Sequence, residues 1–549
     1  MEKHYKKMIY DTENRVTKSL QIQMLDENSP KYGGFSDANG LIHAKFTIYR
    51  VASMIAAYCN ADTKFYHDEN VYNSILLGLM YIKNVQHENG LFDYITCNFY
   101  SAPDTAFCVK KLIPCYEFLL NSNDDKEKII CKKVEEIIRK GAVGLLEGGF
   151  HTPNHRWAIA SVLMKCSRLF GIDELRYEAD RYLNEGIDCN EDGEFSEKSA
   201  GNYNRINNDA MIMLSEVMGD TSYDQYAIRN LRMMLTYIEP DDSIFTANST
   251  RFDKDRLIYP KDYYMEYLKM GTKYHIPEFL EMCNSIFDIV EKKNITSPDF
   301  LIFFMLNPEY RVIEYDGSYQ FPDYNAFYKK SGIARARKDS FTYTVLNGKS
   351  NFLYVHNGTM KLEMKVAGSF CEHRAFISEH MEKMSDSEYH LSQVMKGWYY
   401  LPFDEKPETS DWWAMDNDAR RKKYGPYMHI DVWVKEVQDG LDVRVKTSGV
   451  NGAPWRIELA FTGAAGMYLD GENKKLRGDE VILSKSDEIE LYNESNSMII
   501  SGCFREHFFT DGKEDSELRN SVASTVYLTA FTEFDRIIKI RNKKGVVKC

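Results

Sequence analysis

Between about residues 40 and 310, apolar side chains recur every three to four positions, the spacing of one face of an α-helix. The pattern covers the segments 42–60, 69–87, 103–122, 126–145, 153–170, 173–187, 203–218 and 222–238. Mostly apolar segments, such as 46–59 and 157–170, alternate with charged ones, such as 173–183. Segments near 244–258 and 260–295 are expected to complete the helical part. The pattern therefore predicts pairs of helices, one mostly apolar and one amphipathic.

A short glycine–phenylalanine motif precedes the more apolar helices. It occurs at 33–35, 90–92, 148–150 and 193–195, before helices that start near 42, 103, 153 and 203. Two helices repeated about every 50 residues predict stacked helical hairpins, with inner helices wrapped by outer ones. If the inner helices close into a ring, the fold is an (α/α) toroid. An open solenoid is the alternative.

Beyond about residue 323 the apolar positions alternate with a period of two, as in β-strands. The alternation is clear in 340–346, 427–435, 441–446, 455–461 and 525–530. The predicted fold class is therefore multidomain α and β: an N-terminal incomplete (α/α) toroid followed by a C-terminal antiparallel β-sandwich. The change of period places the toroid in residues 1–315 and the sandwich in residues 316–549.

The composition narrows the range of partners. With 69 Lys and Arg against 82 Asp and Glu, the net charge of −13 argues against nucleic acid as a partner. No run of 18 apolar residues occurs, so no membrane partner is expected. The 11 cysteines are scattered without a Cys-x-x-Cys pair, and neither a metal site nor a cofactor is expected. The charged N-terminus lacks the apolar run of a signal peptide, which predicts a cytoplasmic protein.

The segment 148–157, GGFHTPNHRW, marks the start of one apolar helix. Thr152 is suited to the N-cap and Pro153 to the first helical position. Asn154 and His155 then fall in the first turn, where free backbone N–H groups and the helix dipole favour an anion. An amide and an imidazole there can recognise a carboxylate and remove a proton beside it. An ordinary role as first-turn polar residues is the alternative.

A second segment, 192–203, reads DGEFSEKSAGNY and leads into the next apolar helix. Consecutive helices joined by short loops run antiparallel, so every second helix runs in the same direction. The helices that begin near 153 and 203 should therefore open at the same end of the ring. Tyr203 is then expected to face the same opening as Asn154 and His155.

At this point the chain resembles the polysaccharide lyases that combine an (α/α) toroid with a β-sandwich. This group includes chondroitin/hyaluronate lyases, heparinase III-like enzymes and alginate oligo-lyases. The resemblance rests on the Asn-His pair at 154–155, the Asp-Gly-x-Phe segment at 192–195 with its later tyrosine, and KGWY at 396–399 with DWW at 411–413. Lys198 stands where the chondroitin/hyaluronate branch has a histidine, which puts the base assignment of that branch in doubt.

The resemblance implies β-elimination on a uronate-containing polysaccharide or oligosaccharide, in which the C5 proton is removed and the C4 oxygen leaves. Asn154, with the helix N-terminus, would neutralise the uronate carboxylate. His155 would act as the base when both events occur on opposite faces of the sugar. Tyr203 would protonate the leaving oxygen, and would also be the base when both events occur on one face.

Further residues are candidates for holding the substrate. Arg251 and Arg256 resemble the substrate-binding arginines of the lyases. The other candidates lie near the proposed catalytic residues or in the β-domain: Arg156, Trp157, Asn202, His356, His373, Arg374 and Trp412. Structural roles are the alternative for several of them, such as an ion pair for Arg156 and packing for Trp412.

Other functions are compatible with the same sequence. A glycoside hydrolase would need two carboxylates across the bond, and Asp37, Asp93, Glu194 and Glu197 lie at suitable helix ends. A uronate C5 epimerase would use similar proton chemistry without cleavage. A glycan-binding protein without catalytic activity is the alternative from a different class.

Overall fold

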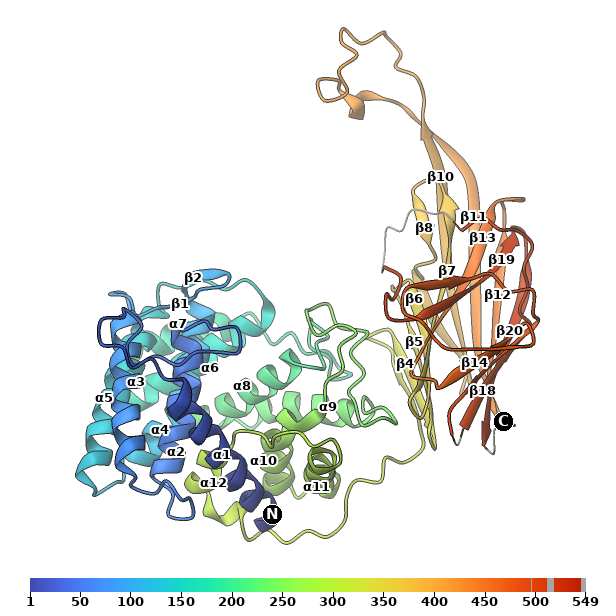
Figure 1. Ribbon diagram of the computed structural model, residues 1–549. Coiled ribbons are helices and arrows are strands. Elements are labelled where there is room, and N and C mark those ends of the chain that lie inside the picture. The colour runs from blue at the N-terminus through green and yellow to red at the C-terminus, as the bar shows by residue number, and fades with distance from the viewer. Residues whose placement is uncertain (495, 511–517, 545–549) are drawn as a thin grey trace. The chain divides into compact units, whose positions relative to one another are not determined.

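The computed structural model describes residues 1–494, 496–510 and 518–544. The chain forms two compact units (Figure 1). The first unit comprises Met1–Ile238 and Asp242–Gln320, and the second comprises Glu239–Asp241 and Phe321–Cys549. Helices dominate the first unit and strands the second, as the change of period near residue 323 predicts.

The first unit is built from helices that alternate between an inner and an outer layer. The inner helices are α2 (Ala44–Tyr58), α4 (Ala102–Leu119), α6 (Pro153–Phe170), α8 (Tyr203–Met218), α10 (Tyr264–Tyr274) and α12 (Leu301–Leu306). The others are α1 (Glu2–Ile22), α3 (Glu69–Val85), α5 (Asp125–Gly144), α7 (Asp173–Leu183), α9 (Ser222–Leu235) and α11 (Pro277–Lys292). A short 3₁₀ turn, η1 (Pro260–Tyr263), precedes α10, and another, η2 (Pro308–Tyr310), follows α12.

The inner helices contact one another in chain order from α2 to α10, and α12 contacts both α2 and α4. This arrangement confirms the predicted (α/α) toroid. It also corrects one expectation, because the segment 244–258 forms a loop rather than a helix. In that loop, the buried carboxylate of Asp253 accepts hydrogen bonds from Ser199, Gly201 and Ser249, which favours the loop over a helix.

Helix α1 has no counterpart among the predicted segments. Its buried side includes His4, Asp11 and Thr12 beside the apolar Tyr5 and Met8, so its hydrophobic periodicity is weak. These polar groups are satisfied inside the fold: His4 Nδ1 lies 3.0 Å from the Tyr264 hydroxyl, and Asp11 accepts the Ser297 N–H at 2.7 Å. None of the helices in the described ranges is long and apolar enough to cross a membrane.

The glycine–phenylalanine motifs are turns that join an outer helix to the next inner one. Gly90 has φ +88°, and a Cβ there would lie 2.1 Å from the carbonyl oxygen of Lys140 in α5. Gly193 has φ +101° and approaches the carbonyl of Arg229 in α9 in the same way. Only glycine permits this conformation and this close approach together. Phe92 and Phe195 are fully buried beside these turns, whereas Phe150 of the third motif is exposed.

In its described residues, the second unit is a sandwich of two nine-stranded sheets. One sheet has the order β15-β14-β17-β18-β20-β12-β11-β10-β9, and the other has the order β16-β19-β13-β7-β6-β5-β4-β3, with β8 paired to β7. The strands are β3 (Tyr324–Tyr328), β4 (Ile333–Lys338), β5 (Phe341–Leu346), β6 (Asn351–Asn357), β7 (Met360–Phe370), β8 (His373–Ala375), β9 (His380–Ser385), β10 (Glu388–Tyr400), β11 (Lys422–Val437), β12 (Gly440–Ser448), β13 (Pro454–Thr462), β14 (Gly466–Leu469), β15 (Glu472–Lys474), β16 (Glu480–Ile482), β17 (Glu488–Tyr492), β18 (Asn496–Ser501), β19 (Ser524–Phe531) and β20 (Asp535–Lys544). Neighbouring strands are antiparallel apart from β16 and β19.

The alternation seen in the sequence explains the sandwich core. On β11, Ile430, Val432 and Val434 are fully buried, and they pack with Val443 and Val445 of β12 in one core shared by both sheets. Strands β10 and β11 form a long hairpin that extends beyond the other strands (Figure 1). The predicted antiparallel β-sandwich is therefore confirmed.

A three-residue segment between α9 and η1 belongs to the β unit. In it, the buried carboxylate of Glu239 lies 2.8 Å from Arg335 Nη2 and 3.2 Å from His356 Nδ1, and it accepts the Thr342 hydroxyl at 2.6 Å. Burial alone would raise the pKa of Glu239, but His356 and Arg335 hold it well below its ordinary value. This ionised cluster fixes residues 239–241 to strands β4, β5 and β6.

Candidate functional site

A cavity of about 1170 Å³ lies inside the helical unit. Its walls come from the inner helices α2, α4, α6, α8, α10 and α12, together with residues Tyr94, Cys97 and Asn98 around the small hairpin of β1 (Phe92–Tyr94) and β2 (Asn98–Ser101). On α8 the lining begins at Tyr203 in the first turn and ends at Glu216 in the last. The cavity therefore follows the inner helices for most of their length.

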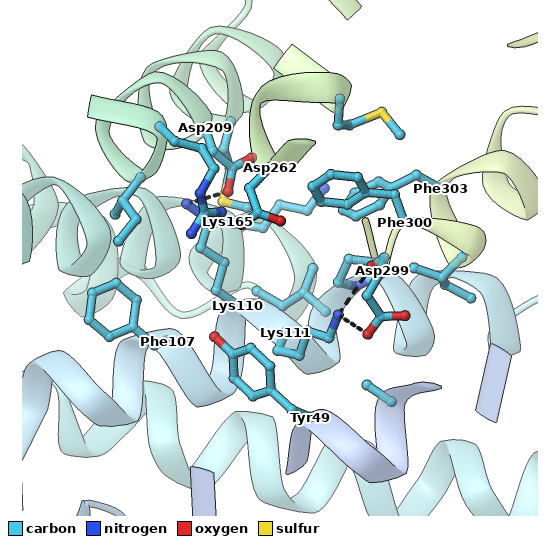
Figure 2. A pocket seen from close by; sticks show the side chains of 18 of the residues that line it. Tyr49, Phe107, Lys110, Lys111, Lys165, Asp209, Asp262, Asp299, Phe300 and Phe303 are labelled. Atoms are coloured by element: carbon cyan, nitrogen blue, oxygen red, sulfur yellow. Dashed lines mark hydrogen bonds and ion pairs between the residues drawn. The ribbon is translucent and has the colours of Figure 1, made fainter. Parts of the chain in front are cut away.

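Ion pairs show that the inner helices run in the same direction. Near the helix starts, Lys45 of α2 pairs with Asp104 of α4 at 2.9 Å. Halfway along, Lys110 of α4 pairs with Asp209 of α8 at 2.6 Å (Figure 2). Near the ends, Lys165 of α6 meets Glu117 of α4, also at 2.6 Å. The paired residues stand at similar positions along their own helices. The first turns of α2, α4, α6 and α8 therefore share one end of the cavity.

His155 lies in the first turn of α6 and lines this end of the cavity. Its ring meets Phe107 of α4 edge to face, with 6.1 Å between the ring centroids. Burial lowers the pKa of His155 to about 4, and the nearby Asp104 carboxylate offsets only part of this effect. The imidazole is therefore neutral at pH 7 and able to accept a proton.

Tyr203 begins α8 and lines the same end of the cavity. The Arg251 guanidinium lies over its ring, 5.4 Å from the centroid, and Phe252 meets the ring edge to face. Burial raises the pKa of Tyr203, although Arg251 opposes this effect. The phenol therefore keeps its proton at neutral pH and can donate it.

Asn154 is fully buried and is not among the residues that line the cavity. Its side-chain Nδ2 donates to Glu197 Oε1 and to the Thr152 hydroxyl, both at 2.9 Å, and its backbone N–H donates to Glu197 Oε2. Glu197 in turn lies 3.3 Å from Arg251 Nε. These contacts use both hydrogens of the Asn154 amide, so Asn154 has no donor left for a substrate carboxylate and instead positions Glu197 and Arg251.

The other candidates of the helical unit divide between the cavity and its surroundings. Asn202 lines the cavity beside Tyr203. Arg156 pairs with Glu185 at 2.8 Å and covers the ring of Trp157, which is fully buried. Arg256 is exposed, with its guanidinium 5.7 Å from the Phe252 ring centroid. The structure thus brings His155, Asn202, Tyr203 and Arg251 together and leaves Arg156, Trp157 and Arg256 outside the lining.

The remaining substrate-binding candidates belong to the β unit. His356 is buried on β6 in the Glu239 cluster. His373 and Arg374 lie on the short strand β8, where Arg374 Nη1 donates to the Cys371 carbonyl at 2.6 Å. Trp412 is half-exposed between β10 and β11, with the Arg420 guanidinium 5.5 Å from its ring centroid. None of the four belongs to the lining of the cavity in the helical unit.

The carboxylates expected for a hydrolase have other surroundings. Asp93 pairs with His87 at 2.8 Å, and buried Glu194 accepts the Tyr237 hydroxyl at 2.9 Å. Neither of these, nor Asp37 or Glu197, is among the residues that line the cavity. In the described ranges, no three His, Cys, Asp or Glu side chains are grouped as a metal site requires.

Most of the charged residues of the cavity wall were not predicted from the sequence. These are Lys45, Asp104, Lys110, Lys111, Glu117, Lys165, Arg205, Asp209, Glu216, Asp262, Glu266, Lys269 and Asp299. Figure 2 shows Lys111 reaching Asp299, at 3.0 Å, below the rings of Phe300 and Phe303. The sequence feature that could have revealed these residues is the presence of charged side chains within otherwise apolar helices, such as Lys110 and Lys111 in α4.

Comparison with solved structures identifies the architecture. A chondroitin AC lyase of Streptomyces coelicolor A3, in complex with chondroitin sulphate, matches with a TM-score of 0.58 and 10% identity, over 98% of this chain and 79% of the other. A Paenibacillus xanthan lyase matches with a TM-score of 0.57 and 9% identity, over 98% of this chain and 56% of the other. A heparinase III matches with a TM-score of 0.51 and 11% identity, over 91% of this chain and 77% of the other.

The chain has the fold of the toroid and β-sandwich polysaccharide lyases. The resemblance inferred from the short sequence motifs is thereby confirmed at the level of the fold. No protein-family model and none of the curated proteins matches the chain in sequence.

Proposed function

We propose that the protein is a lyase that cleaves uronate-containing polysaccharides or oligosaccharides by β-elimination. The observation that carries the proposal is the group at the cavity end, where a neutral imidazole, a protonated phenol and a guanidinium lie together. His155, Tyr203 and Arg251 supply these groups from α6, α8 and the loop before η1. Similarity of fold to polysaccharide lyases adds support.

In the proposed reaction, Arg251 binds the uronate carboxylate and stabilises the negative charge that develops on it. The imidazole of His155 takes the C5 proton, and the electron pair of that C–H bond forms the C4–C5 double bond. The bond from C4 to the glycosidic oxygen breaks, and the Tyr203 hydroxyl donates its proton to that oxygen. Proton exchange with solvent then restores both side chains. The pKa directions of His155 and Tyr203 suit these two roles.

The test is absorbance of the C4–C5 double bond in the near ultraviolet, measured with a panel of uronate oligosaccharides. Tyr203→Phe and His155→Ala should each lower turnover by about 10² or more, the usual scale for acid–base groups. Tyr177→Phe is the matched control, because Tyr177 is exposed on α7. Full activity of Tyr203→Phe, with wild-type helical content, would refute the assignment.

A glycoside hydrolase is the second candidate function, and one pair of carboxyl groups favours it. Burial raises the pKa of Glu266, and the Asp209 carboxylate adds to the effect. Burial alone would raise the pKa of Asp209, but Lys110 holds this pKa below its ordinary value. A protonated and an ionised carboxyl in one cavity are what glycoside hydrolysis requires. New reducing ends without near-ultraviolet absorbance, abolished by Glu266→Gln, would indicate this function.

A further inference from the structure

The cavity continues far beyond the proposed catalytic residues. Along α8 its lining runs from Tyr203 to Glu216, about 20 Å at the helical rise per residue. Its volume of about 1170 Å³ is above the range of about 300–1,000 Å³ that is usual for small-molecule pockets. One sugar acid beside His155 and Tyr203 would therefore leave the rest of the cavity, here called the deep part, empty.

The charges of the cavity wall are nearly balanced. Among the described residues, seven cationic side chains line it, and so do seven Asp and Glu side chains, of which Glu266 has a pKa raised by burial. Besides the pairs already described, which include Lys111 with Asp299, Lys269 pairs with Glu216 at 2.8 Å. Arg205 faces Asp262 and Glu266, which raise its pKa although burial lowers it. Each cation along the deep part thus already faces a carboxylate.

This balance disfavours an anionic sugar in the deep part of the cavity. A sulfate or carboxylate that leaves water needs a compensating cation, and here each cation would first have to give up its own partner. A hydroxyl group both donates and accepts hydrogen bonds, so it can bind beside a Lys–carboxylate pair without separating it.

Aromatic side chains provide the complementary apolar surface. Tyr49, Phe107, Phe300 and Phe303 lie around the Lys110 and Lys111 ion pairs (Figure 2). Apolar and aromatic walls combined with placed polar groups are typical of pockets that enclose small molecules. Rings and paired charges together match a pyranose, which has apolar C–H faces and a hydroxylated edge.

We infer that the deep part of the cavity binds uncharged sugar residues of the glycan whose uronate lies beside His155 and Tyr203. The link to the uronate rests on the proposed lyase function. The substrate class is then a glycan in which a uronate adjoins neutral residues, rather than one charged at every residue. The site itself is defined by binding and is measurable without turnover.

The first experiment uses isothermal titration calorimetry with neutral trisaccharides of glucose, mannose, galactose and xylose, and with a chondroitin sulphate tetrasaccharide. Wild-type protein should bind at least one neutral trisaccharide more tightly than the sulfated probe. Met213 lines the cavity about 15 Å beyond Tyr203 along α8. Met213→Trp should weaken neutral binding at least about tenfold by filling the space, whereas the matched Met213→Leu should change it less than about twofold.

A second variant tests the charge argument without changing volume. Asp209→Asn leaves Lys110 without its carboxylate and makes the net charge of the cavity one unit more positive. Affinity for the sulfated probe should rise about tenfold or more, the scale of a hydrogen bond to a charged group, while neutral binding changes little. Sulfated binding that is tighter than neutral binding in wild type, or neutral binding that Met213→Trp leaves intact, would overturn the inference.

The outcomes also separate this inference from the proposed function. Neutral binding that Met213→Trp abolishes, without turnover of any uronate, would refute the lyase and support the neutral-sugar site. Turnover of uronate oligosaccharides without binding of any neutral trisaccharide would support the lyase and overturn the site.

Discussion

Glu239→Gln should strongly destabilise the β unit. The substitution keeps the shape of the side chain but removes the negative charge that Arg335 and His356 face. Arg335 is fully buried, so its guanidinium would lose, inside the core, the carboxylate that lies 2.8 Å from it. Removing one partner of a buried ion pair typically costs about 3–5 kcal/mol, which corresponds to a change of more than about a hundredfold in the ratio of folded to unfolded protein.

The assay is urea unfolding followed by tryptophan fluorescence. Of the six tryptophans, those at 398, 412, 413, 433 and 455 belong to the β unit, so this signal reports mainly on its unfolding. Asp535→Asn is the matched control, because Asp535 pairs with Arg444 at 2.6 Å on the surface of the same unit, where solvent screens the charges. If both substitutions lower the free energy of unfolding equally, the reasoning about the buried cluster is wrong.

Two further predictions concern the cavity end. His155, the proposed base, has a pKa of about 4. The value of kcat/KM on uronate oligosaccharides should therefore stay level from about pH 9 down to pH 5 and fall only near pH 4. A fall of kcat/KM already at about pH 6.5, the usual pKa of histidine, would contradict this environment of His155. Arg251→Lys should lower kcat/KM by about 10–100-fold, because an ammonium cannot replace a planar guanidinium in binding a carboxylate, whereas Arg256→Lys should change it less than about threefold. Equal losses in steady-state kinetics of the two arginine variants would argue against a specific role for Arg251.

The architecture was accessible from the sequence because it depends on local periodicity. The helical period of three to four and the strand period of two report which side of each element is buried, and this requires no knowledge of distant contacts. Helix α1 was missed for the same reason, since part of its buried side is polar and is satisfied only by residues far along the chain, such as Tyr264 and Ser297.

The candidate site was partly accessible. His155 and Tyr203 follow from the rule that alternate helices run in the same direction, and the structure places both at one end of the cavity. The proposed transfer of the carboxylate-binding role from Asn154 to Arg251 was not predictable, because it depends on where Glu197 lies. Glu197 is 43 positions from Asn154 in the sequence, yet its carboxylate accepts a hydrogen bond from the Asn154 amide. The same carboxylate also pairs with Arg251.

The sequence by itself determined the two kinds of secondary structure, their order, and the helix starts that carry a polar pair and a tyrosine. These features come from interactions between residues close along the chain. Only the tertiary structure decided which side chains share the cavity, which charges neutralise one another there, and which are protonated. Partners such as Lys110 and Asp209 are almost a hundred residues apart, and both burial and pKa depend on distances that folding alone creates.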